Sequence, residues 1–141
     1  MTFLKSLLVT AVVYGLGAYT AQGADLKLIA NLSVNVSSVS ADDLRNIFLE
    51  TKTSLSGGGR LEPVLSKGGP THEAFLKQYL GKTDAALNTY YRSLVFTGKA
   101  FMPKILASDT DIAAYVAKTK GAIGYVNAGA STPGAKTITV K

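Results

Sequence analysis

Strand-like and helix-like patterns alternate along residues 26–141, and this alternation restricts the fold more than any other feature of the chain. Apolar side chains occupy every second position over residues 26–37, which is typical of a half-buried strand, at least as far as Asn31. Strands that alternate with helices predict an α/β domain built on a single sheet with helices on both faces. The other predicted strands are residues 60–66, 121–128 and 136–141.

Four segments between these strands carry apolar residues at helical spacing. Ser40 with Asp43 resembles a capping box, and so does Ser108 with Asp111, so each pair predicts the start of a helix. Gly81 follows one helical pattern as a stop signal. The predicted helices are residues 41–49, residues 71–80, a helix from Thr83 that closes near Gly98, and a helix that begins after Ser108.

The apolar face of each helix predicts which side chains enter the core. In the helix that starts at Thr83 this face is Leu87, Tyr90, Tyr91, Leu94 and Val95, an aromatic stripe that we interpret as core. The predicted core of the whole domain contains Phe48, Phe75, Tyr79, Leu87, Leu94, Val116 and Ile123.

The first residues of the chain have the order of a secretory signal peptide. Lys5 precedes an apolar run over residues 6–18, and small residues follow up to Gly23, where we expect cleavage. The alternative is an uncleaved membrane anchor, but the run is interrupted and shorter than the ~20 apolar residues that a span requires. We therefore expect residues 24–141 to form one exported, periplasmic domain without stable membrane insertion.

The charge and the cysteine content restrict the partners of this domain. The chain has 15 basic and 9 acidic residues, and loss of Lys5 would leave 14 − 9 = +5, which attracts anions in general. The lysines are scattered without aromatic interleaving, so a nucleic-acid platform is not indicated. With no cysteine, the chain cannot form disulfides, and an oxidising compartment is compatible with it.

The stretch "SKGGPTHEAF" joins a predicted strand to a predicted helix and is the strongest candidate for a ligand site. The start of a helix offers unpaired N–H groups and partial positive charge, and ligands of open α/β sheets bind at such strand-to-helix junctions. Glycines allow close approach of an anion to the backbone. The sequence thus predicts an anion site of Ser66, Lys67, Gly68, Gly69 and Thr71, whereas the alternative is a well-made turn without a ligand.

Catalytic and metal-binding patterns are weak. His72 is the only histidine, the acids show no ligand spacing, and no nucleophile elbow is present. We expect His72 to be an exposed residue of a first helical turn. "TSLSGGGR", residues 53–60, precedes a strand rather than a helix, so we interpret it as a flexible connection and not as a phosphate cradle. These observations predict a protein that is not an enzyme and that uses no cofactor or metal.

Several motifs together resemble a known family. "SADDLRNIFLE", "HEAFLKQYLG", "YYRSLVFTGK" followed by "MPK", and "YVAKTKGAIGYV" are similar to the small exported proteins described as phosphate ABC transporter substrate-binding-like. These proteins are related to the phosphate-binding protein of the type 2 periplasmic binding superfamily. The resemblance covers residues 26–126 and implies a fold equivalent to one lobe of a two-lobed binding protein.

In the full-length phosphate binders the matching loop reads Arg-Ser-Asp-Gly-Ser-Gly-Thr. Alignment on the following helix places Leu65 at the arginine and Lys67 at the aspartate, whereas Ser66, Gly68 and Thr71 match. A lysine does not restore the bidentate contacts of arginine. Loss of the acidic acceptor removes discrimination between protonated phosphate and sulfate.

Two functional hypotheses follow. The first is an exported binding protein for a small oxyanion, phosphate or sulfate with phosphate implied by the resemblance, in which Lys99 adds positive charge and a homodimer supplies the missing lobe. The second is an interaction or sensory module for an envelope or transporter protein that has no small ligand. In that case an exposed edge of the opening strand or of the last strand, "KTITVK", accepts a partner strand.

Overall fold

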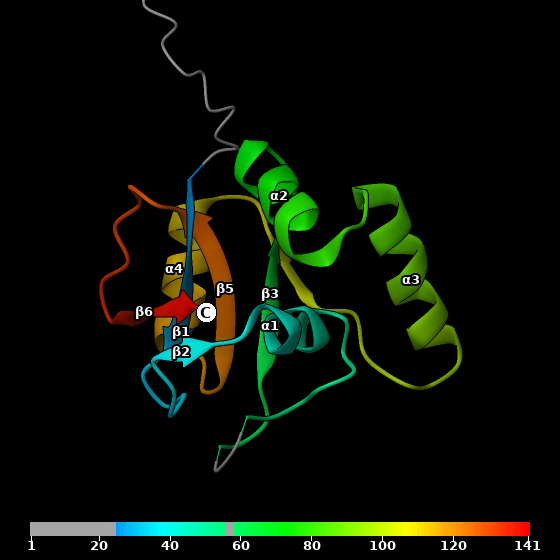
Figure 1. Ribbon diagram of the computed structural model, residues 1–141, viewed down its shortest axis with the longest axis horizontal. Helices are drawn as coiled ribbons and strands as arrows, with labels where there is room; N and C mark the ends of the chain where they lie inside the picture. Colours follow the sequence, from blue (N-terminus) through cyan, green and yellow to red (C-terminus); the bar gives the residue numbers. More distant parts are fainter. Residues whose placement is uncertain (1–24, 56–57) are drawn as a thin grey trace, which may run out of the picture.

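The computed structural model describes residues 25–55 and 58–141 (Figure 1), so the predicted signal peptide lies outside the described residues. The described chain forms one six-stranded sheet in the order β2-β6-β1-β5-β3-β4. The strands are β1 (Leu26–Asn31), β2 (Ser38–Val39), β3 (Glu62–Ser66), β4 (Lys104–Leu106), β5 (Ala122–Asn127) and β6 (Ala135–Val140).

The helices begin where the capping residues predict. Ser40 Oγ accepts a hydrogen bond from Asp43 N–H at 3.0 Å, and Ser108 Oγ accepts one from Asp111 N–H at 3.1 Å. Gly81 and Gly98 adopt φ values of 62° and 70°, the left-handed conformation of a helix end. The helical segments are α1 (Ala41–Phe48), α2 (Pro70–Phe75), which continues as the π-helical segment η1 (Leu76–Leu80), α3 (Asp84–Phe96) and α4 (Asp109–Lys118).

The sheet is mixed, because β1 is antiparallel to β5 and β6 whereas β3 is parallel to β5 and β4. Strands β2 and β4, which are only two and three residues long, were not predicted from the sequence. These two strands form the edges of the sheet. The expectation that the opening or last strand offers a free edge is therefore wrong: β1 lies between two strands, and β2 pairs with β6 at Thr139 and Val140.

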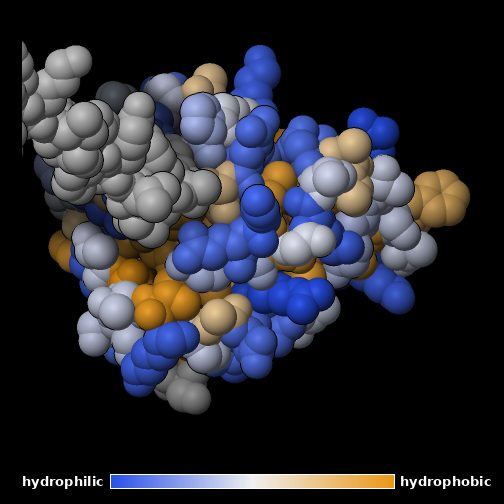
Figure 2. Space-filling model, turned by 45° about the horizontal axis from the view of Figure 1, so that its top comes forward, coloured by the Kyte–Doolittle hydropathy of each residue, from blue (hydrophilic) through white to orange (hydrophobic). Residues whose placement is uncertain are grey.

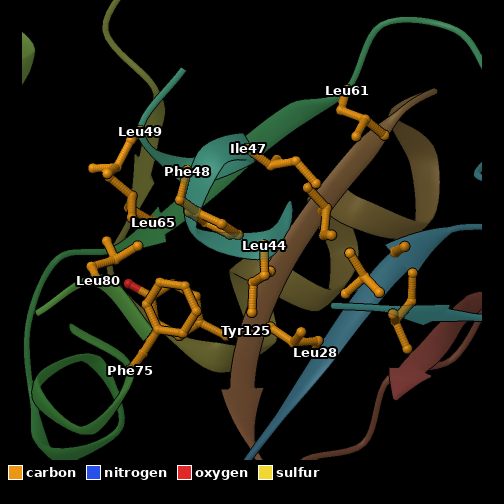
Figure 3. Close-up of a cluster of buried hydrophobic side chains, with 14 of the residues drawn as sticks. Leu28, Leu44, Ile47, Phe48, Leu49, Leu61, Leu65, Phe75, Leu80 and Tyr125 are labelled. Carbon is orange, nitrogen blue, oxygen red and sulfur yellow. The ribbon is translucent and has the colours of Figure 1, made fainter. Parts of the chain in front are cut away.

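Helices cover both faces of the sheet, as predicted (Figure 1). On one face, α1, α2, η1 and α3 pack on the sheet around Phe48, Phe75 and Tyr125 (Figure 3). The rings of Phe75 and Tyr125 are stacked with centroids 3.9 Å apart. On the other face, α4 packs Ile112 and Val116 against the sheet. The outer surface is mostly hydrophilic on the side shown in Figure 2, with small apolar areas between polar side chains.

Five of the seven predicted core residues are fully buried: Phe48, Phe75, Leu87, Val116 and Ile123. The other two, Tyr79 and Leu94, are only half-buried at the border of the core. In η1 the Gly81 N–H bonds to the Leu76 carbonyl, five residues back, and this wider turn buries Leu76 and Leu80. Val95, which the helical face predicted as inward, is 44% exposed.

Helix α3 is held to α1 by its aromatic stripe. Tyr90 Oη donates to the carbonyl of Leu49 at 2.5 Å, and the buried Tyr91 hydroxyl donates to the carbonyl of Phe48. These bonds satisfy carbonyls at the C-terminal end of α1, which have no partner within the helix. The interpretation of the stripe as core is confirmed for Tyr91. None of the helices that the structure describes is long and apolar enough to cross a bilayer.

Candidate functional site

The predicted anion loop lies between the C-terminal end of β3 and the N-terminal end of α2, as expected. Ser66 is the last residue of β3, and Pro70 is the first of α2. The backbone between them forms a bend, and the helical conformation then continues to Leu80. The first N–H groups of such a segment have no acceptor within it, although Pro70 contributes none.

A cavity of about 430 Å³ opens beside this loop. Two of the five predicted site residues, Ser66 and Lys67, line it, whereas Gly68, Gly69 and Thr71 lie next to it in the chain. Gly68 and Gly69 are exposed and Thr71 is half-buried. The other residues that line the cavity are His72, Asp84 and Asn88, which are polar, and Leu65, Leu87 and Ile105, which are apolar.

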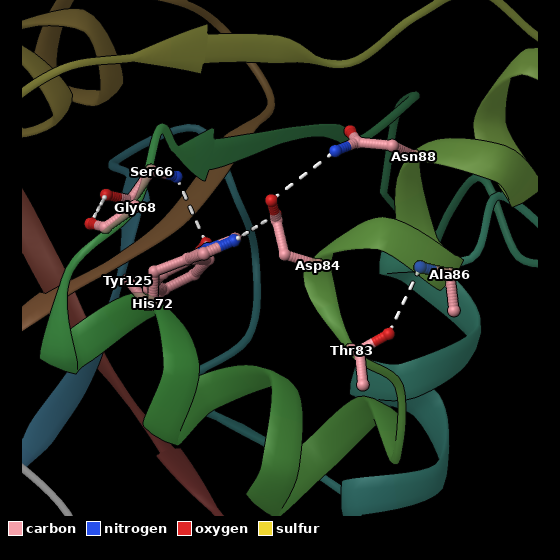
Figure 4. Close-up of polar contacts among 8 residues, drawn as sticks. All are labelled: Ser66, Gly68, His72, Thr83, Asp84, Ala86, Asn88 and Tyr125. Atoms are coloured by element: carbon pink, nitrogen blue, oxygen red, sulfur yellow. Dashed lines mark hydrogen bonds and ion pairs between the residues drawn. The ribbon is translucent and has the colours of Figure 1, made fainter.

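His72 is not exposed, so that expectation is wrong. Only 2% of its surface is accessible, and both ring nitrogens have partners (Figure 4). Nδ1 lies 2.5 Å from the hydroxyl of Tyr125, and Nε2 lies 2.8 Å from Oδ1 of Asp84. The histidine therefore connects β5, at the centre of the sheet, with the first residue of α3.

The backbone fixes the direction of one of these hydrogen bonds. The N–H of Ser66 can only donate, and it donates to the Tyr125 hydroxyl oxygen at 3.0 Å. The Tyr125 hydroxyl proton is free to donate to Nδ1 of His72 in the tautomer that carries the ring proton on Nε2, and Nε2 then donates to Asp84. In that tautomer every polar group in the chain from Ser66 to Asp84 is satisfied.

Burial dominates the acidity of Tyr125. Removal from water disfavours the phenolate and raises the pKa of Tyr125 well above its ordinary value, and the negative charge of Asp84 raises this pKa further. The hydrogen bond from the Ser66 N–H opposes the shift but does not cancel it. Tyr125 thus stays a neutral donor, which keeps the connection with His72 intact.

The structure shows how Ser66 and the two glycines shape the predicted loop. The Ser66 hydroxyl donates to the carbonyl of Gly68 at 3.0 Å, so its proton holds the loop and is not directed at a ligand. Gly69 has a φ of 98°, in a region where a side chain is strained, whereas a Cβ atom at Gly68 would meet nothing within 4 Å. Gly68 is therefore the position where a side chain can be added without backbone strain.

Lys99 does not reach the site. It follows the C-terminal end of α3, and its N–H donates to the carbonyl of Leu94. Asp84, which lines the cavity, lies at the opposite end of this helix. A helix of this length spans roughly 20 Å. Lys67 is the basic side chain that the structure brings to the cavity.

Sequence reasoning missed Tyr125 and Asp84 as partners of His72. The burial of His72 could have been predicted from the sequence, because His72 precedes Phe75 by three residues and Leu76 by four, which places it on the apolar face of its helix. The partners of His72 could not be predicted, because they lie 12 and 53 positions further along the chain. Among residues 25–55 and 58–141 no group of three or more potential ligands is placed to hold a metal ion.

Comparison with known proteins gives a match in structure but not in sequence. No protein-family model matches the chain, and no curated protein matches it. An ABC-type phosphate transport receptor from Vibrio cholerae superposes over 83% of the chain with a TM-score of 0.64 and 16% identity. The chain has the fold of one lobe of such a protein. The match covers 46% of the Vibrio receptor.

Two further solved structures share this fold. A Clostridium perfringens protein described as a phosphate ABC transporter substrate-binding protein, with bound phosphate, matches 83% of the chain with a TM-score of 0.65 and 18% identity, over 45% of its own length. PstS from Borrelia burgdorferi matches 84% of the chain with a TM-score of 0.64 and 11% identity, over 47% of its own length. The chain thus spans less than half the length of the solved proteins it matches, and the predicted fold is confirmed.

Proposed function

We propose that the chain is a non-enzymatic binding protein for a small oxyanion, held by the backbone of Gly68, Gly69 and Thr71, the Thr71 hydroxyl and the Lys67 ammonium. The observation that carries this proposal is the exposed loop between β3 and α2 beside an open cavity, with Lys67 at its rim. Unpaired N–H groups and one flexible cation suit a tetrahedral anion. Ser66 shapes the loop through its bond to Gly68.

We also infer a preference for phosphate over sulfate from Asp84. Asp84 and Lys67 line the same cavity, and the Asp84 side chain is 55% exposed. Phosphate keeps a proton at neutral pH and can donate it to this carboxylate, whereas sulfate has none and is repelled. A carboxylate that already accepts from His72 retains lone pairs for such a donor. Asp84 thus takes, from α3, the acidic role that the loop itself lacks.

Two of the solved proteins that share this fold support this function. The Clostridium protein is described with bound phosphate, and the Vibrio protein as a phosphate transport receptor. We extend the proposal to an exported chain, cleaved after Gly23, that acts in the periplasm and is linked to phosphate uptake. N-terminal sequencing of envelope material should then begin at Ala24 or Asp25, and recovery of intact Met1 chain from membranes contradicts this part.

Calorimetric titration with phosphate, sulfate and a neutral solute tests the binding function. An open, single-lobe site leaves the ligand in contact with water, so we expect a dissociation constant between micromolar and millimolar, about −4 to −8 kcal/mol. Asp84→Asn should reduce the preference for phosphate over sulfate while retaining an acceptor for His72. Absence of saturable heat with either anion at millimolar concentration and low salt overturns the proposal, and the interaction-module hypothesis then takes its place.

A further inference from the structure

The C-terminal end of α3 and the connection to β4 expose large apolar side chains. Phe96 is 93% exposed and Phe101 is 85% exposed, and Val95, Met102 and Ile105 each expose more than two-fifths of their surface. We call these five residues the α3–β4 apolar patch. They occur within eleven positions of the chain, 95–105, and three of them, Phe101, Met102 and Ile105, line one cavity. Large apolar side chains that are exposed together mark interaction sites in folded proteins.

The segment of the chain that carries this patch is basic. Between Asp84 and Asp109 the chain carries Arg92, Lys99 and Lys104 and no acidic residue. Arg92, Lys99 and Lys104 are all exposed. Figure 2 shows one apolar ring that stands out from the surface at the right-hand rim, the side on which Figure 1 shows α3. Bulky apolar side chains next to cationic ones are suited to bind an anionic lipid bilayer, because the apolar groups enter the acyl region and the cations contact the headgroups.

Acidic side chains lie beside part of the patch. Glu50 and Glu62 line a cavity of about 400 Å³ together with Phe101, Met102 and Ile105. Arg60 and Lys104 line the same cavity and offset this negative charge. Phe96, at the end of α3, does not line this cavity, and the charged residues nearest to it in the chain are Arg92 and Lys99.

We propose that the α3–β4 apolar patch docks on an anionic lipid bilayer, with Phe96 and Phe101 inserted at the level of the headgroups and Arg92, Lys99 and Lys104 against lipid phosphates. A second copy of the chain fits the same surface less well, because a two-fold contact would bring the three cations of each copy together. The proposal uses residues outside the oxyanion loop and does not depend on that site.

The absence of tryptophan from the sequence allows a local test with the full chain. Phe96→Trp and Phe101→Trp each place a single fluorophore in the patch. Leu32→Trp is the matched control, because Leu32 is 66% exposed on a turn after β1, outside the patch. Each variant is mixed with vesicles of phosphatidylcholine alone or of equal parts phosphatidylcholine and phosphatidylglycerol, with brominated acyl chains as quencher.

The anionic vesicles should shift the emission of Phe96→Trp and Phe101→Trp to the blue and quench it, and leave Leu32→Trp unchanged. This readout is local, so attachment through the N-terminal segment alone does not produce it. Arg92→Gln and Lys99→Gln should each weaken binding to anionic vesicles by about fivefold. Lys118→Gln, an exposed lysine in the last turn of α4, should not.

Three results overturn the proposal. The first is emission from the patch fluorophores that stays characteristic of water in the presence of anionic vesicles. The second is blue-shifted emission without vesicles that increases with protein concentration, which assigns the patch to a second copy of the chain. The third is quenching of Leu32→Trp that equals the quenching of the patch fluorophores.

Discussion

The Nε2 atom of His72 lies 2.8 Å from Oδ1 of Asp84, and this hydrogen bond ties the start of α3 to the helix that follows the candidate anion loop. On its other side His72 bonds to Tyr125, which in turn holds the backbone N–H of Ser66. The strand end that begins the loop, the helix that follows it and the wall of the cavity are thus connected through one buried ring. This connection holds the two elements that flank the loop against the wall of the cavity.

His72→Ala should reduce the free energy of unfolding by about 2 to 4 kcal/mol, because it opens a cavity and leaves the buried Tyr125 hydroxyl without its acceptor. Chemical denaturation measures the change. Asn88→Ala is the control: its amide makes a 3.4 Å bond to Asp84 at the surface, and its loss should cost under about 0.5 kcal/mol. A loss under about 1 kcal/mol for His72→Ala contradicts a structural role for the connection.

Phe75→Ala should cost about 3 to 5 kcal/mol of unfolding free energy. Phe75 is fully buried between Tyr125, at 3.9 Å between ring centroids, and Phe48, at 4.8 Å. Truncation removes contacts on both sides, and the sheet limits how far the cavity can close. Thermal and urea unfolding should both report the loss. A cost below about 1 kcal/mol means that the ring does not pack as described.

Thr71→Ala should weaken phosphate binding by about ten- to a hundredfold, since a hydrogen bond to a charged oxyanion contributes roughly 1.5 to 3 kcal/mol. Calorimetric titration measures the affinity. Thr110→Ala is a matched control, because Thr110 is the second residue of α4, as Thr71 is of α2. If both variants bind as the unmodified chain does, the Thr71 hydroxyl does not contact the anion.

Lys67→Ala should weaken anion binding and make it less dependent on salt, because an exposed cation acts through a field that salt screens. The measurement is the slope of affinity against ionic strength. Lys118→Ala removes an equal charge from α4 and should leave that slope almost unchanged. Equal slopes for the unmodified chain and Lys67→Ala place the lysine outside the site.

Alkaline pH should destabilise the fold through Tyr91 and Tyr125. Burial raises the pKa of both phenols above the ordinary value of 10.0, so the folded chain keeps protons that the unfolded chain loses. Their contribution to stability is complete below about pH 10 and decreases as the pH rises further. Tyr91→Phe and Tyr125→Phe should each reduce this slope by about 1.4 kcal/mol per pH unit, measured by urea unfolding. Unchanged slopes in both variants contradict the effect.

The sequence by itself determined the helices, the long strands and the position of the loop. Ser40, Ser108, Gly81 and Gly98 act on neighbouring backbone, so the ends of the helices are local features that the sequence predicts. The alternation in β1 predicts the face that carries Leu28 and Ala30, but the strand is not half-buried as expected, because Ile29 is buried on the other face under α4. The edge strands could not be predicted from the sequence, because a strand as short as β4, with three residues, is defined by its pairing with β3.

Only the tertiary structure decided what surrounds the loop. The partners of His72 come from α3 and β5, and hydrogen bonds across 12 and 53 residues leave no periodic signal in the chain. Tertiary packing also decided that α3 buries Tyr91 but exposes Phe96, because only one side of that helix meets the sheet layer. Local backbone preferences set the elements, whereas long-range packing set which polar groups are buried together and which apolar groups remain exposed.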